Sequence, residues 1–196
     1  MMRARNRRAV RPREAGLSLI ELMIAMLVMT VGFMATMILI STAIASNNRN
    51  KLDTTATALS QMVTETVAAQ SVVVGAPMTV VDCRPTAAGG PQTWTIATAV
   101  GPNVNDQAGA SVDATTGSIN FTQLYANVPV GYKMEFVACG AAGTQATYDV
   151  RWNIRRISAF SKLVTVSTRQ IGARAGGPQQ LQYFTPPVTL RTIAGF

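Results

Sequence analysis

Residues 16–40 read GLSLIELMIAMLVMTVGFMATMILI, and this stretch decides the fold of the chain. The apolar run continues to about Ala45, and Glu21 is the only charged side chain in it. A helix needs about 20 such residues to span the core of a bilayer. An ionised carboxylate at the bilayer centre costs roughly 2.5–3.5 kcal/mol. Glu21 therefore predicts a partner charge, and with it a function.

A basic leader precedes the apolar run. Residues 1–16 hold six arginines and a single acid, Glu14, and clustered positive charge keeps that end of a membrane segment in the cytoplasm. A secretory signal peptide has small residues after its apolar region, whereas Ala15 and Gly16 come before it here. An ordinary N-terminal membrane anchor is the other simple interpretation of the hydropathy.

The junction at Gly16, Leu17 and Glu21 resembles the N-terminal signature of type IV prepilins and pseudopilins. Members have a basic leader, a glycine, a hydrophobic first mature residue (usually Phe) and a glutamate at the fifth mature position. The resemblance implies that a prepilin peptidase cuts between Gly16 and Leu17 and N-methylates Leu17. It also implies an α+β type IV pilin fold, in which a long N-terminal helix, transmembrane and then amphipathic, packs on an antiparallel β-sheet head domain.

Glu21 is the candidate residue for pairing between subunits. Cleavage frees the amino group of Leu17, and Glu21 of a neighbouring helix can pair with it, so that each charge offsets the burial of the other. The pair also fixes the axial register, because a slip of one turn leaves both charges unpaired. The alternative is that Glu21 reaches the lipid headgroups alone.

The helical pattern continues beyond the membrane segment. Apolar residues recur with amphipathic helical spacing at Leu52, Ala56, Leu59, Val63 and Val67. We expect a cleaved leader over 1–16, a transmembrane half-helix over 17–45, an amphipathic half-helix over 46–70 and a β-rich head domain over 71–196.

The head domain reads as strands and turns. In the clearest strand, Tyr148–Ile154, apolar and polar residues alternate. Its expected hairpin partner is Lys162–Thr168, and this hairpin resembles that of PilV-like minor pilins. We expect a long loop and an irregular tail, over Gly101–Gly117 and after Ile171. Further candidate strands are Met78–Cys83, Thr93–Val100, Ser118–Tyr125, Gly131–Cys139 and, at an edge, Leu181–Thr185.

Two cysteines, Cys83 and Cys139, fall within the expected head domain. An oxidising compartment favours a disulfide between them, and two buried free thiols are the alternative. The chain has no histidine, and it has no GxSxG nucleophile motif or phosphate-binding loop. We therefore expect no catalytic residues, no cofactor and no metal.

Arg151 and Arg155 are the candidates for contact with nucleic acid. Alternation places both on the polar, exposed face of one strand, from which they could reach phosphates. A solvated strand face that discourages edge pairing is the favoured interpretation. We therefore do not expect nucleic acid as a partner.

These observations predict a minor type IV pilin, PilV-like, that acts in pilus assembly, priming or modification. The expected partners are major and minor pilins, the prepilin peptidase, the inner-membrane assembly platform and membrane lipid. We expect a single pass through the bacterial inner membrane, with a cytoplasmic leader and a periplasmic head, before the subunit enters the pilus. The alternatives are a minor pseudopilin of type II secretion and a DNA- or surface-binding protein of the pilus tip.

Overall fold

The computed structural model describes residues 18–70, 78–86, 89–139, 146–171 and 186–195. The chain divides into two compact units, Met1–Asn47 and Asn48–Phe196. The leader, the junction at Gly16 and Leu17, and the expected edge strand Leu181–Thr185 lie outside the described residues.

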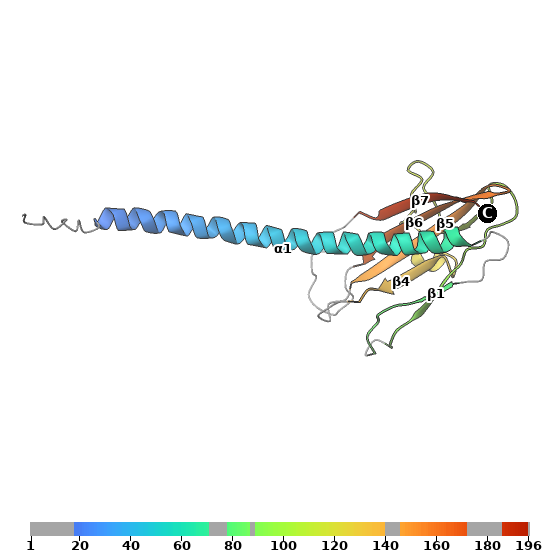
Figure 1. Ribbon diagram of the computed structural model, residues 1–196, viewed down its shortest axis with the longest axis horizontal. Coiled ribbons are helices and arrows are strands. Elements are labelled where there is room, and N and C mark those ends of the chain that lie inside the picture. Colours follow the sequence, from blue (N-terminus) through green and yellow to red (C-terminus); the bar gives the residue numbers. More distant parts are fainter. Residues whose placement is uncertain (1–17, 71–77, 87–88, 140–145, 172–185, 196) are drawn as a thin grey trace, which may run out of the picture. The chain divides into compact units, whose positions relative to one another are not determined.

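One helix, α1 (Leu19–Ala69), contains residues of both units (Figure 1). Its sequence is rich in Ala, Leu and Met, which favour helix, and it contains no proline. The helix ends where the sequence predicts. It begins two residues after Leu17, because Ser18 serves as its N-cap.

The second half of α1 buries one face. Leu52, the first residue of the predicted stripe, is half-buried. The buried residues are the other four and one serine: Ala56, Leu59, Ser60, Val63 and Val67. The hydroxyl of Ser60 hydrogen-bonds that of Thr168 in the sheet, with 2.7 Å between the oxygens. This bond satisfies the one polar side chain on the buried face.

The head is built on an antiparallel sheet of five strands (Figure 1). The strand order is β3-β5-β6-β7, and β4 also pairs with β5. The elements are β3 (Gln107–Gly109), β4 (Lys133–Val137), β5 (Thr147–Ser158), β6 (Ser161–Ile171) and β7 (Val188–Gly195). A separate two-stranded sheet pairs β1 (Met78–Val81) with β2 (Thr93–Ile96), and η2 (Tyr125–Asn127) is a 3-10 turn.

The alternation of β5 places its apolar residues in the main core. Tyr148, Val150, Trp152 and Ile154 are fully buried, and they share one cluster with the stripe of α1. The Tyr148 hydroxyl donates to the Leu52 carbonyl at 3.3 Å. Each buried aliphatic side chain contributes about 1.5–3 kcal/mol. The fold is α+β, as predicted, with one long N-terminal helix packed on an antiparallel sheet, and it is consistent with the type IV pilin fold.

The expected strand Ser118–Tyr125 is wrong. The segment makes only an isolated bridge, between Val112 and Ile119, and then turns, because the Asn120 carboxamide oxygen accepts the N–H of Thr122 at 2.8 Å. Its Ile119 and Phe121 side chains belong to a second, smaller core, which is centred on Ala110, Ile119 and Val128.

Two expected irregular regions contain strands. The long loop includes the short strand β3, which pairs with β5 through Gln107, Ala108 and Gly109. The tail includes β7, whose β-branched residues follow Pro186 and Pro187 directly. A strand that starts just after proline keeps every backbone N–H that its pairing needs.

Candidate functional site

The first turn of α1 holds the candidate pairing residue. The N–H of Glu21 donates to the Ser18 hydroxyl at 3.2 Å, and the N–H of Leu22 donates to the Ser18 carbonyl at 3.2 Å. Ser18 and Glu21 therefore stand at the two positions of a capping box, S-x-x-E, which satisfies backbone N–H groups that a helix start leaves open. The sequence carried this signal, although we did not predict a role for Ser18.

Glu21 is exposed, and it makes no ion pair among the residues that the structure describes. Gly16 and Leu17 lie outside those residues. The cleavage position, the methylation of Leu17 and the pairing of Glu21 therefore stay predictions.

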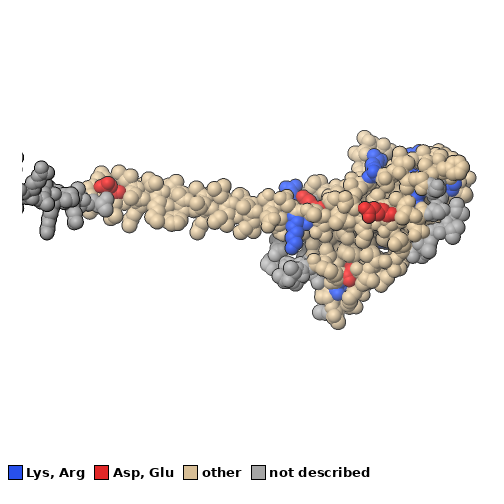
Figure 2. All heavy atoms as spheres, in the orientation of Figure 1, with Lys and Arg blue, Asp and Glu red and all other residues tan. Residues whose placement is uncertain are grey.

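The first half of α1 exposes apolar side chains in every direction. All of its residues are exposed, and the helix contains one stretch that is long and apolar enough to cross a membrane. Figure 2 shows this part as uncharged surface with an acidic side chain near its start. Such a surface suits lipid or a bundle of similar helices.

Three threonines in this half hydrogen-bond within the helix itself. The hydroxyls of Thr30, Thr36 and Thr42 donate to the carbonyls three residues earlier, at 2.8, 2.8 and 2.9 Å. These bonds leave no hydroxyl proton in need of an outside acceptor. The polar atoms therefore cost little in an apolar environment.

The candidate Arg151 is buried, which corrects the expectation of a solvated strand face. The residue is 2% exposed, and its guanidinium donates to both carboxylate oxygens of Asp149, at 2.9 and 2.8 Å. A third bond, of 2.7 Å, goes to the Gln123 carbonyl. Arg169 also pairs with Asp149, at 3.2 Å.

The segment between β3 and β4 covers this polar face of β5. Two aromatic rings of that segment, Phe121 and Tyr125, lie against the arginines. The Phe121 ring centroid lies 5.0 Å from the guanidinium of Arg151 and 4.4 Å from that of Arg169. Tyr125 lies 5.5 Å from Arg151. Burial, reinforced by the negative charges of Asp149 and Glu135, raises the pKa of Tyr125 to about 12. The phenol therefore stays neutral at physiological pH.

Arg155 is exposed, and its hydrogen-bond partner differs from that of Arg151. Its guanidinium donates to the carboxamide oxygen of Asn105 at 2.7 Å. The structure thus does not bring the two arginines together as a phosphate-binding pair. The opposite charges at Asp149 and Arg151, two residues apart on one strand face, were the signal that could have predicted an ion pair.

Cys83 and Cys139 are joined by a disulfide in the structure, with their Cα atoms 5.2 Å apart. The bond links the segment after β1 to the end of β4. The backbone N–H of Cys83 also donates to the Val137 carbonyl at 2.9 Å. The bond therefore fastens the small β1-β2 sheet to the main sheet.

Asp82, next to Cys83, organises the loop between β1 and β2. Its carboxylate accepts the N–H groups of Gln92 and Arg84, at 2.7 and 3.2 Å, and the indole N–H of Trp94, at 3.3 Å. Burial raises the pKa of Asp82, but these bonds and the charge of Arg84 outweigh it and hold the pKa below its ordinary value.

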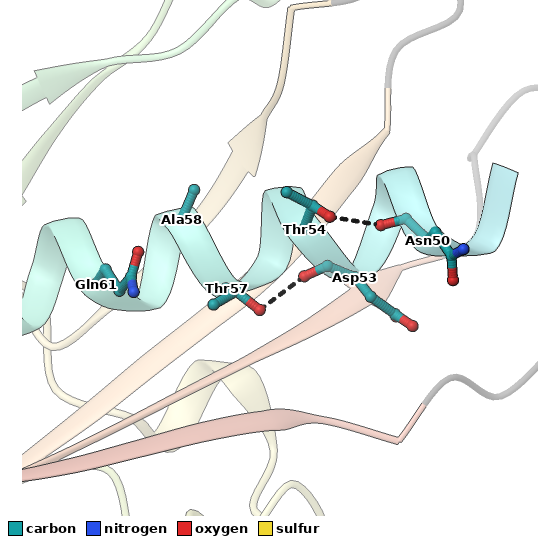
Figure 3. Close-up of a pocket in the computed structure, with 6 residues that line it drawn as sticks. All are labelled: Asn50, Asp53, Thr54, Thr57, Ala58 and Gln61. Atoms are coloured by element: carbon teal, nitrogen blue, oxygen red, sulfur yellow. Dashed lines mark hydrogen bonds between the residues drawn. The ribbon is translucent and has the colours of Figure 1, made fainter. Parts of the chain in front are cut away.

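The exposed face of α1 in the head offers no reactive cluster. A shallow, open depression there is lined by Asn50, Asp53, Thr54, Thr57, Ala58 and Gln61 (Figure 3). The Thr54 and Thr57 hydroxyls donate to carbonyls of the preceding turn, at 2.7 and 2.8 Å. Among the described residues, no group of three or more His, Cys, Asp or Glu side chains could hold a metal ion.

A family model described as the prokaryotic N-terminal methylation motif matches residues 11–37. The chain has a prepilin-like N-terminus. The match supports a protein of the type IV pilin or pseudopilin kind, and together with the apolar helix it supports anchoring in a membrane. Searches of curated proteins and of solved structures find no match.

Proposed function

We propose that this chain is a minor type IV pilin, PilV-like, that joins a pilus through its N-terminal helix after prepilin peptidase cleavage. One observation carries the proposal: the methylation motif runs directly into α1, whose exposed apolar half holds a single charge, Glu21. The hairpin of β5 and β6 supports it, because it contains the stretches that resemble PilV-like minor pilins.

The proposed mechanism begins with cleavage after Gly16. The freed amine of Leu17 lies one residue before the capped first turn, in which Ser18 holds the N–H of Glu21. In a bundle, Glu21 of one subunit pairs with the amine of its neighbour. Pairing offsets part of the cost of placing a carboxylate in the bilayer, which reaches about 2.5–3.5 kcal/mol at the bilayer centre, so assembly favours the register in which the charges meet.

The proposed location follows from the leader. Its arginines hold the N-terminus in the cytoplasm, and a single pass of α1 places the head in the periplasm and later on the pilus. The partners are other pilins, the prepilin peptidase, the inner-membrane assembly platform and membrane lipid.

N-terminal mass spectrometry of the membrane-extracted protein tests the cleavage site. We expect a chain that begins with N-methylated Leu17. The substitution Gly16→Val should leave a precursor that retains residues 1–16, whereas the matched Gly32→Val should be processed normally, because a side chain at Gly32 meets no atom within 4 Å. A native chain that begins elsewhere would overturn the proposal.

Co-assembly tests the role of Glu21. Glu21→Ala should insert in the membrane normally, since removal of the charge favours insertion, but it should be lost from sheared pili. Glu65→Ala, an exposed glutamate in the second half of α1, is the matched control. Equal incorporation of both variants would contradict the pairing.

A minor pseudopilin of type II secretion is the neighbouring candidate, since it would share the same N-terminal motif. Deletion of the gene should abolish or alter pili in the first case and impair protein export in the second. A DNA-binding role at the pilus tip is not favoured, because Arg151 is buried and bonded to Asp149.

A further inference from the structure

The two edges of the main sheet differ in the hydrogen bonds that their backbones make. At the β4 edge, the backbone N–H of Cys83 donates to the Val137 carbonyl at 2.9 Å, and the Arg84 guanidinium donates to the Glu135 carbonyl at 3.3 Å. At the opposite edge, the backbone of β7 pairs with β6, and among the described residues its backbone makes no other hydrogen bond. Among the described residues, β7 is the last strand of the sheet on this side, and no further strand pairs with it (Figure 1).

The β7 strand carries few of the features that protect a sheet edge, and Arg191 is its one charged residue. Its pairing with β6 runs from Thr168–Val188 to Ser161–Gly195 without a bulge. It contains no proline and no lysine, the residues that commonly block edge pairing. In an antiparallel pair, alternate residues direct their N–H and C=O groups away from the partner. These groups can accept one more strand.

The β7 strand carries one charged side chain, and that charge is positive. Arg191 lies on β7 itself and is exposed. Its guanidinium lies against Gly117, where an added Cβ would collide with it.

An exposed apolar residue neighbours this arginine. Ile193 is 68% exposed, and it shares a face of β7 with Arg191, because the two are separated by one residue. A complementary strand would therefore place a carboxylate beside Arg191 and an apolar side chain beside Ile193.

We propose that β7 is a docking edge for an extended, acidic segment of a partner protein, which adds to the sheet as a further strand. A strand satisfies the row of backbone groups along β7, and a carboxylate on it meets Arg191. Nucleic acid or anionic lipid would use the charge of Arg191 and leave the backbone groups unpaired. The inference goes beyond the proposed function and does not depend on processing at Gly16.

The experiment uses the full chain in detergent micelles and a fluorescent heptapeptide, acetyl-Thr-Val-Thr-Glu-Thr-Val-Thr-amide. Fluorescence anisotropy should show saturable binding. The same peptide with every amide N-methylated should bind at least about tenfold more weakly, because each lost hydrogen bond weakens association. Hydrogen exchange should show slower exchange of β7 amides when the unmodified peptide is bound.

Two charge reversals locate the site. Arg191→Glu should weaken binding about fivefold, the scale of an exposed ion pair, whereas Lys51→Glu, on the exposed part of α1, should leave it unchanged. Both variants should keep the thermal unfolding temperature of the wild type. Ile193→Lys should weaken binding as well, because lysine protects an edge.

Several outcomes would overturn the proposal. They are equal binding of the N-methylated peptide, no saturable binding of the unmodified peptide up to about 1 mM, and protection confined to amides outside β7. Saturable binding of a single-stranded oligonucleotide or of anionic vesicles, without binding of the peptide, would assign the edge to a different partner.

Discussion

Glu21 and Asp149 are two carboxylates in opposite situations. Asp149 is 2% exposed, and guanidinium nitrogens of Arg151 and Arg169 lie 2.8 and 3.2 Å from it. Glu21 is exposed on an apolar helix, and the described residues give it no cationic partner. The head thus satisfies the charge of Asp149 inside one chain, whereas the proposed assembly would give Glu21 its partner from a neighbouring subunit.

The largest expected effect follows from breaking the buried pair. Asp149→Ala should lower the free energy of unfolding by about 3–5 kcal/mol, because it leaves Arg151 buried without its carboxylate. Denaturant unfolding of the full chain in detergent, followed by tryptophan fluorescence, measures this. Glu21→Ala in the same assay should leave the unfolding of the head unchanged. A loss of less than about 1 kcal/mol for Asp149→Ala, which is the range of exposed ion pairs, would contradict the proposed difference between Asp149 and Glu21.

A pair of leucines sharpens the comparison within one helix. Leu59 is 7% exposed and Leu27 is 65% exposed. Leu59→Ala should lower the free energy of unfolding of the head by about 2–5 kcal/mol, because it removes buried methyl groups and leaves a cavity. Leu27→Ala should not change it. Similar losses for both variants would show that the apolar half of α1 contributes to the stability of the head.

The disulfide gives the next effect. Cys83 and Cys139 are 56 residues apart in the sequence. The double variant Cys83→Ser/Cys139→Ser should lower the free energy of unfolding by about 2–4 kcal/mol, because the unfolded chain loses a constraint. Insertion of the apolar half into membranes should be unaffected. An unchanged denaturation midpoint, with mass spectrometry confirming that the wild type is oxidised, would contradict the prediction.

The smallest expected effect is on the stability of the folded state at low pH. The folded pKa of Asp82 lies below its ordinary value, so the unfolded state takes up the proton first and stability falls as the pH drops below about 4. Asp82→Asn should therefore flatten this part of the curve of unfolding temperature against pH. An unchanged acid limb in the variant would show that other carboxylates cause it.

The elements that pack on each other could be predicted, because their apolar spacing is local. Val63 and Val67 on α1 and Trp152 on β5 lie in the core where their periods place them. The same alternation was misleading for Arg151, since it gives the face of a strand but not what covers that face. Phe121, which covers it, is thirty residues earlier in the sequence.

Other misses had local signals that were outweighed. The glycines and prolines of the tail suggested irregular structure and obscured the β-branched residues of β7. Ser18 and Glu21 match the capping pattern, which predicts a role for the N–H of Glu21 that is separate from the charge of its side chain. The bond between Gly16 and Leu17, where the chemistry is expected, remains a prediction from the motif.

The threonines of the apolar half have a consequence for transfer between environments. Each hydroxyl of Thr30, Thr36 and Thr42 carries its acceptor within the same turn. A helix built this way need not exchange hydrogen-bond partners when its surroundings change from fatty acyl chains to protein side chains. In the proposed assembly, these three hydroxyls would therefore add no hydrogen-bond cost when the subunit leaves the bilayer or when it returns to the lipid.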